Sequence, residues 1–125
     1  MTFLKKENKI YIIAEIGVNH NGKISLAKKL IKKGHEVVGN DNMILGDIEN
    51  LPNGIKFYNT DCNNYEEMIN NIKGSDIVFH CAATAHEGLS VFSPNFITKN
   101  IFQASISVIT ASIVNNVKNF VFCSS

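Results

Sequence analysis

Short apolar runs alternate along this chain with segments whose apolar residues recur at helical spacing. The runs occupy 10–14, 36–39, 55–58, 76–80 and 119–123, and the helical patterns occupy 24–33, 65–72 and 97–115. Strands separated by helices need crossover connections, which make the strands parallel and cover both faces of the sheet. The alternation therefore predicts an α/β fold, a Rossmann-like doubly wound parallel sheet with strand order 3-2-1-4-5, truncated after the fifth strand.

Size and composition indicate a single domain that spans residues 1–125. The hydrophobic fraction is 45% and the net charge is +1, without a basic stripe, which argues against disorder and against a nucleic-acid partner. The sequence shows no uninterrupted apolar run of membrane-spanning length and no secretion signal, so no membrane partner is expected. Three cysteines without CxxC spacing favour a reducing, cytoplasmic location over a disulfide framework, and the four histidines show no metal-ligand spacing.

The loop between the first strand and the first helix has part of a phosphate-binding pattern. Gly22 lies 12 residues before Gly34, the spacing between the last glycine of a Rossmann loop and the turn after its helix. On that register Asn19 and Ile16 stand where glycines are expected, and Gly17 fills an extra-glycine position. Bulk at those positions crowds a pyrophosphate. The loop therefore predicts weak dinucleotide binding, and an ordinary connection that binds nothing is the alternative.

Two aspartates follow the second and third strands. Asp41 lies 19 residues after Gly22, where an acidic side chain accepts hydrogen bonds from ribose hydroxyls and repels a 2′-phosphate. The alternative is that Asp41 is only a turn residue in Gly39-Asn-Asp-Asn42 and binds no ligand. Asp61 is a candidate acceptor for an adenine amino group, although Thr60 or Asp61 could instead cap the following helix.

Small residues follow the fourth strand in His80-Cys-Ala-Ala-Thr84. Ala82 and Ala83 would let the backbone pass close to a flat cofactor. His80 is interpreted as a packed core histidine rather than a ligand or a base, and no metal site is predicted.

These landmarks, with Ser90–Pro94, Asn100 and the stretch from Val117 to Ser125, resemble the extended short-chain dehydrogenase/reductase family over about residues 28–125. The likeness is greatest to NAD-dependent nucleotide-sugar epimerases and dehydratases. It implies NAD as cofactor and a nucleotide sugar as substrate. It also implies a role for each of several residues: Asp41 at ribose, Asp61 and Cys62 at adenine, Ala82, Ala83 and Asn100 along the cofactor, Gly17, Asn19 and Gly22 in the phosphate loop, and Ser125, or its neighbour Ser124, as the catalytic serine.

The Tyr-x-x-x-Lys motif of that family does not occur in these 125 residues. The three tyrosines, Tyr11, Tyr58 and Tyr65, are followed four positions later by Glu15, Cys62 and Ile69. In the family the tyrosine transfers the proton and the lysine lowers its pKa. The expected function is therefore the NAD-binding portion of a nucleotide-sugar epimerase or dehydratase, catalytically incomplete by itself. The alternative is a non-catalytic Rossmann-fold module for binding or interaction.

The beginning of the chain has a resemblance of its own. Residues 9–31, which include Ala-Glu-Ile-Gly-Val-Asn-His-Asn-Gly at 14–22, resemble the N-terminus of sialic acid synthases. Those enzymes are (β/α)8 barrels that use a divalent metal, and Glu15 would match an acidic residue near their substrate. One strand and one helix cannot form a barrel, so a synthase relative is the least favoured function. The expected layout is a synthase-like start over 1–31 joined by gene fusion to an epimerase-like part over 32–125, with chance drift of a Rossmann loop as the alternative.

The helical pattern over 97–115 is apolar around much of its circumference. One face must cover the sheet, which leaves isoleucine or valine residues for the other face. In the resembled family this helix forms a dimer interface, so a homodimer through this helix is predicted. In the alternative, the serines and Thr110 face water and the helix only covers the sheet.

Overall fold

A computed structural model of the chain describes residues 10–14, 21–44, 46–84 and 87–123. Five strands form one sheet in the order β3-β2-β1-β4-β5, and every neighbouring pair is parallel. The strands are β1 (Ile10–Ala14), β2 (Glu36–Asp41), β3 (Lys56–Asn59), β4 (Ile77–His80) and β5 (Asn119–Phe122). The predicted α/β fold class is therefore confirmed, with β1 at the centre of the sheet.

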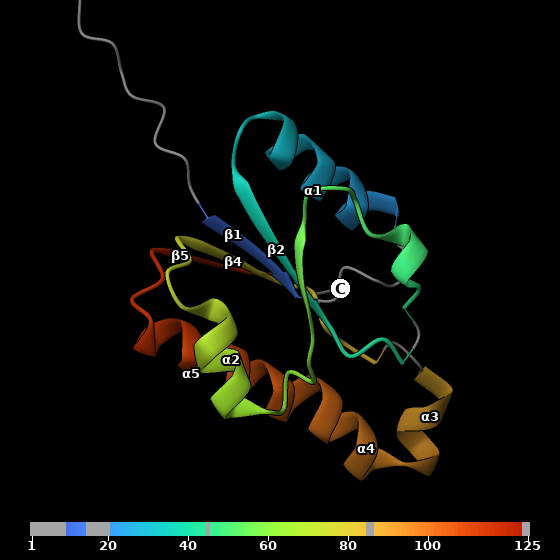
Figure 1. Cartoon of the computed structure of the whole chain (residues 1–125). Coiled ribbons are helices and arrows are strands. Elements are labelled where there is room, and N and C mark those ends of the chain that lie inside the picture. Colours follow the sequence, from blue (N-terminus) through green and yellow to red (C-terminus); the bar gives the residue numbers. More distant parts are fainter. Residues whose placement is uncertain (1–9, 15–20, 45, 85–86, 124–125) are drawn as a thin grey trace, which may run out of the picture.

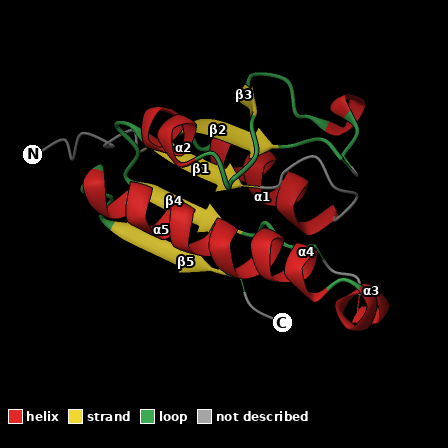
Figure 2. Ribbon diagram, turned by 90° about the horizontal axis from the view of Figure 1, so that it is seen from below, coloured by secondary structure: helices red, strands yellow, loops and turns green. Residues whose placement is uncertain are grey.

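Helices cover both faces of this sheet (Figure 1). On one face lies α1 (Asn21–Lys32), and on the other lie α2 (Tyr65–Ile72) and a continuous helical run. The run consists of α4 (Pro94–Thr98), η2 (Lys99–Gln103), which has π-helical hydrogen bonding, and α5 (Ala104–Val114). Viewed from below, the run crosses β4 and β5 with α3 (Glu87–Phe92) at its far end (Figure 2).

Two short helices were not predicted. The helix α3 precedes the long run, and a single 3-10 turn, η1 (Ile48–Asn50), interrupts a segment that the sequence indicated to be a plain loop. The long run also begins at Pro94 rather than at 97, because proline in the first turn of a helix lacks only an N–H that the helix would leave unbonded.

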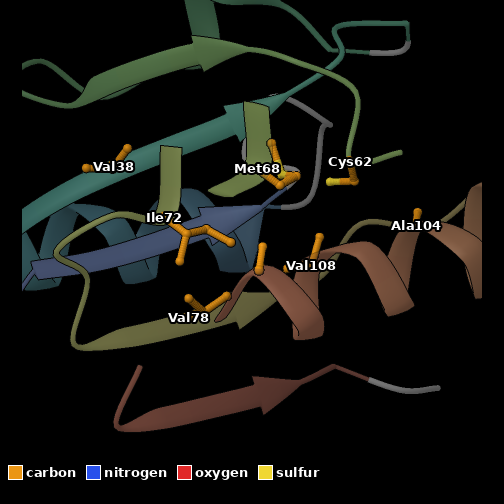
Figure 3. Packing of buried hydrophobic residues seen from close by; sticks show 8 residues of the cluster. Val38, Cys62, Met68, Ile72, Val78, Ala104 and Val108 are labelled. Carbon is orange, nitrogen blue, oxygen red and sulfur yellow. The ribbon is translucent and has the colours of Figure 1, made fainter. Parts of the chain in front are cut away.

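The larger hydrophobic core lies between the sheet and the pair α2 and α5 (Figure 3). Its centre is made by side chains that are at least nine-tenths buried: Val38, Cys62, Met68, Ile72, Val78, Ala104, Val108 and Ala111. On the opposite face Ala27 of α1 packs against Val37 of β2 with partly buried neighbours. Both faces of the sheet are thus covered by apolar contacts, as a parallel sheet requires.

The face that α5 turns to the sheet consists of small residues. Ala104, Ser107, Val108, Ala111 and Ser112 are buried. The larger residues Ile106, Ile109, Ile113 and Val114 are exposed. Small side chains let the helix approach the sheet closely, and Ser112 Oγ donates to the Val108 carbonyl oxygen at 2.7 Å, which satisfies one buried hydroxyl. The alternative in which all the serines face water is therefore wrong.

The ends of two helices show how local sequence sets their length. Asn64 caps α2, since its side chain accepts a hydrogen bond from the Glu67 N–H, so the alternative in which Thr60 or Asp61 caps this helix is wrong. Just beyond the C-terminal end of α5, Asn116 adopts a positive φ of 54°, a backbone conformation that asparagine tolerates better than most residues. The Asn115 side chain donates to the Ile69 carbonyl oxygen at 2.9 Å and ties α5 to α2.

The run Pro94–Val114 is 21 residues long, has a mean hydropathy of 1.3 over its most apolar window and is 28% buried there. By length and composition alone it could cross a membrane, and core helices of soluble proteins pass the same test. In this fold its small-residue face covers the sheet.

Candidate functional site

The loops that leave the carboxyl ends of β2, β3 and β4 surround a cavity of about 230 Å³. Residues of α3, α4, η2 and the start of α5 complete it. Its lining is Asp41, Asn42, Ile44, Thr60, Asp61, Cys62, Asn63, Ala82, Ala83, Thr84, Leu89, Phe96, Asn100 and Ala104. A cavity at this edge of a doubly wound sheet lies where such folds bind ligands.

Asp41 is the last residue of β2 and is buried in the cavity wall. Its Oδ1 accepts a hydrogen bond from the Met43 N–H at 2.8 Å, and Met43 has a positive φ of 59°. The main-chain oxygen of Asp41 accepts from the Thr60 N–H at 3.0 Å. The carboxylate thus shapes the turn after β2 and also borders the cavity.

Asp61 lies in the loop after β3, where its Oδ1 accepts from the Asn63 N–H at 2.8 Å and from the Asn63 side-chain amide at 3.0 Å. The same amide nitrogen lies 3.4 Å from Oδ1 of Asn100 in η2. This polar bridge joins the loop after β3 to η2, so two predicted positions far apart in sequence meet at one wall of the cavity. Asn63 was not predicted, although it follows Asp61 in an asparagine-rich loop.

A buried network of polar side chains lies behind the loops that follow β2 and β3 and hydrogen-bonds to them. Asn40, which is 2% exposed, donates from Nδ2 to the Thr60 carbonyl oxygen at 3.0 Å. The Asn71 side chain on α2 donates to Asn40 Oδ1 and to Thr60 Oγ1, both at 3.2 Å. The network ties β2, the loop after β3 and α2 together and holds Asp41 and Cys62 at fixed positions. Cys62 Sγ lies 3.8 Å from Asn40 Nδ2.

On the β4 side of the cavity Ala82 and Ala83 line the wall, and their close approach to a cofactor stays a prediction. His80 does not line it. Its ring is 1% exposed, lies 2.9 Å through Nε2 from Ser105 Oγ, and packs at a tilt against the rings of Phe120 and Phe122. The interpretation of His80 as a packed core residue is confirmed.

The apolar side of the cavity was missed from the sequence. Leu89 of α3, Phe96 of α4 and Ile44 of the loop after β2 supply it. Phe96 is 42% exposed and Ile44 is 71% exposed, so this wall is open to solvent. Their spacing along the chain gives no signal, because they come together only through the placement of α3 and α4.

The remaining predicted residues belong to the phosphate loop and to the end of the chain. Gly22 is the second residue of α1, and its contact with a cofactor stays a prediction. Gly17, Asn19, Ser124 and Ser125 fall in segments that the structure does not describe, as does Ile16. Within the described part of the chain no three potential metal-ligating side chains gather.

The chain is similar to known proteins in sequence and in structure. The model of the family described as NAD dependent epimerase/dehydratase matches residues 24–125. Among solved structures, UDP-glucose 4-epimerase from Thermotoga maritima superposes with a TM-score of 0.86 at 28% identity, over 93% of this chain and 38% of that one. UDP-N-acetylglucosamine 4-epimerase from Methanobrevibacter ruminantium gives 0.83 at 28% identity, over 94% and 38%.

An NAD complex of UDP-glucose 4-epimerase from Thermus thermophilus has the same fold, with a TM-score of 0.83 at 22% identity, over 93% of this chain and 37% of that one. The chain thus spans a little over a third of the length of these structures. No curated protein sequence gives a significant match. With a family model that covers most of the chain, the resemblance stated from the sequence is confirmed, and the chain belongs to the NAD dependent epimerase/dehydratase family.

Proposed function

We propose that this chain is the NAD-binding portion of a nucleotide-sugar epimerase or dehydratase. The observation that carries the proposal is the convergence on one cavity of six positions from separate places in the sequence. The family resemblance implies contact with NAD for each of them: Asp41, Asp61, Cys62, Ala82, Ala83 and Asn100. The T. thermophilus neighbour, whose fold is the same, holds NAD.

The donors and acceptors at the cavity fit an adenosine group. Asp41 offers a carboxylate to ribose hydroxyls, and Asp61 offers one to the adenine amino group. The apolar wall of Leu89 and Phe96 suits a flat heterocycle. A volume of about 230 Å³ is below the roughly 300–1,000 Å³ of drug-sized sites, so this cavity takes the adenosine end rather than the whole dinucleotide. When bound, NAD supplies hydride transfer.

The rest of the proposal concerns the reaction and the layout of the chain. The substrate class of the whole protein is a nucleotide sugar, and this is supported by one neighbour structure that contains UDP-glucose and another in complex with UDP-N-acetylmuramic acid. Ser125, or Ser124, is the serine of the catalytic group, and without Tyr-x-x-x-Lys these 125 residues bind cofactor but do not complete the reaction.

We further propose one cytoplasmic Rossmann-like domain over 1–125, with a start at 1–31 that derives from a sialic-acid-synthase-like sequence.

Calorimetric titration with NAD tests cofactor binding. We expect saturable heat from the unchanged chain, and we expect Asp61→Ala to weaken NAD binding by about tenfold, because a hydrogen bond to an ionised acceptor contributes roughly 1.5–3 kcal/mol and Asp61 is partly screened by water. Asp47→Ala is the matched control. Asp47 Oδ1 also accepts from the N–H two residues on, at 3.0 Å, but Asp47 does not line the cavity.

The result contradicts the proposal if no NAD heat appears, or if Asp47→Ala weakens binding as much as Asp61→Ala. An absence of binding would instead favour the non-catalytic interaction module.

We also propose that the chain self-associates through the exposed face of α5 and η2. Phe102, Ile106, Ile109 and Ile113 follow one another at spacings of four, three and four residues, so they form one stripe along the helix. All four are 39–70% exposed. A stripe of this kind is typical of helix-to-helix packing between two copies.

Light scattering across a concentration series checks this association. Ile113→Asp should shift the monomer–dimer equilibrium toward monomer by at least about tenfold, because an interface would have to bury an unpaired carboxylate. Ile48→Asp is the matched control, since Ile48 is 68% exposed and Ile113 is 70% exposed, but Ile48 lies in η1. A stable monomer at high concentration in the unchanged chain contradicts the prediction, and binding to lipid vesicles by that monomer would indicate a membrane surface as the occupant.

A further inference from the structure

Two cysteines meet at the carboxyl edge of the sheet, outside the cavity. His80 and Phe122, the last residues of β4 and β5, are direct partners in the parallel ladder, so the next residues, Cys81 and Cys123, come opposite each other. The ladder continues one step further, because the Cys123 N–H donates to the His80 carbonyl oxygen at 3.0 Å. The two sulfur atoms lie 3.2 Å apart, and both residues are thiols.

This placement satisfies the backbone requirement for a disulfide. Neighbouring strands lie roughly 4.7–4.9 Å apart, and bridged cysteines have Cα separations of roughly 4.4–6.8 Å. The separation of 42 residues along the chain hides the pair from any reading of cysteine spacing. Only the order of β4 and β5 in the sheet, with their shared register, brings the two thiols together.

The pair is also accessible. Cys123 is exposed and Cys81 is half-buried, so a small reagent can approach Cys123 from solvent. The remaining cysteine, Cys62, is 8% exposed, since it packs in the core cluster with Met68 and Ile72 at the cavity wall. The chain therefore carries its own internal reference, a thiol shielded by packing.

We propose that Cys81 and Cys123 form a dithiol that a low-molecular-weight disulfide such as glutathione disulfide converts to an intramolecular disulfide. In the first step the Cys123 thiolate attacks one sulfur of glutathione disulfide, forms a mixed disulfide and releases one glutathione thiolate. In the second step the Cys81 thiolate attacks the Cys123 sulfur and releases the second glutathione. Two protein thiols are oxidised, one glutathione disulfide is reduced to two glutathione thiols, and the two cysteine protons pass to the two leaving thiolates.

The bridge would join the ends of two strands beside the proposed cofactor site. Cys81 immediately precedes Ala82 and Ala83 in the cavity wall, and Cys123 immediately precedes Ser124. Oxidation at this position fixes the spacing between the carboxyl ends of β4 and β5. The effect on cofactor binding rests on the proposed function, whereas the thiol chemistry does not.

Mass spectrometry of the folded chain after incubation with glutathione disulfide tests the proposal. The expected product has lost two hydrogen atoms, retains one of three titratable thiols, and yields a peptide that links Cys81 to Cys123. Because the second thiol is already in contact, the mixed disulfide of the unchanged chain should stay below about a tenth of the product. In Cys81→Ser the second step is lost, so the glutathione adduct on Cys123 should accumulate instead.

Cys62→Ser is the control that should leave the bridge intact. Circular dichroism of each serine variant shows that it is folded, and the oxidised unchanged chain can be tested even if one variant fails to fold. The proposal is overturned if the unchanged chain keeps three thiols, if its glutathione adduct accumulates as in Cys81→Ser, if the linked peptide contains Cys62, or if the disulfide forms between two chains. The NAD titration of the reduced chain is a separate measurement. Failure of the disulfide proposal is therefore distinguishable from failure of the proposed function.

Discussion

Replacement of Met68 by alanine should lower the free energy of unfolding by about 2–5 kcal/mol. Met68 lies on α2, is 2% exposed and belongs to the cluster that joins α2 and α5 to the sheet (Figure 3). Alanine removes the apolar atoms and leaves a cavity that α2 cannot close, because the Asn71 and Asn115 side chains hold the helix to β2 and α5. Urea denaturation followed by circular dichroism measures the loss.

Two further variants give this measurement its meaning. Met68→Leu nearly conserves the volume and should cost less than about 1.5 kcal/mol. Glu67→Ala changes the neighbouring exposed residue of the same helix and should stay within about 0.5 kcal/mol of the unchanged chain. Equal losses for Met68→Ala and Glu67→Ala would show that α2 does not pack as the structure describes.

The fold class could be predicted from the sequence because it depends on local periodicity. Each predicted apolar run forms one strand of the parallel sheet, and Gly34 and Gly74, both at positive φ, mark helix ends that glycine permits. The helices α3 and η1 escaped prediction because each is only one or two turns long, too short for a periodic signal.

The orientation of α5 shows where composition misleads. Its isoleucines are more hydrophobic than its serines, so a simple ranking would bury Ile106 and Ile109 and expose Ser107 and Ser112. The structure does the reverse, since Ser107 and Ser112 are buried on the face that also holds Val108, while the isoleucines are exposed. Which face of the helix is covered depends on where α2 and the sheet lie, and no local pattern contains that information.

The candidate site likewise contains residues that the sequence could predict and contacts that it could not. That Asp41, Asp61 and Ala82 lie together at the cavity could be predicted, because each lies at or just after the carboxyl end of a strand and those ends share one edge of the sheet. The bridge from Asp61 through Asn63 to Asn100 and the support from Asn40 depend on contacts across 20 to 37 positions of the chain. The phosphate loop around Gly17 and Asn19 lies outside the described residues, so its role stays a prediction.

Asp41→Asn should change the preference between NAD and NADP by about a hundredfold. The unchanged chain is expected to favour NAD, because the ionised carboxylate accepts hydrogen bonds from the ribose hydroxyls and repels a 2′-phosphate at the same position. The Met43 N–H donates to Asp41 Oδ1 at 2.8 Å in the wild-type chain. Asparagine keeps the shape of the side chain and an oxygen that can accept this hydrogen bond, but it removes the negative charge. Binding of NAD should weaken and binding of NADP should strengthen, each by about tenfold, or roughly 1.4 kcal/mol.

Calorimetric titration of both dinucleotides into both chains measures this change as a ratio of dissociation constants, which cancels any general loss of folded protein. Asp47→Asn removes one negative charge from the same kind of turn, since Asp47 Oδ1 also accepts from the N–H two residues on, yet Asp47 does not line the cavity. Its ratio should match that of the unchanged chain. A similar shift in both variants would mean that net charge, rather than the position of Asp41, sets the preference. An unchanged ratio in Asp41→Asn would mean that the ribose lies elsewhere.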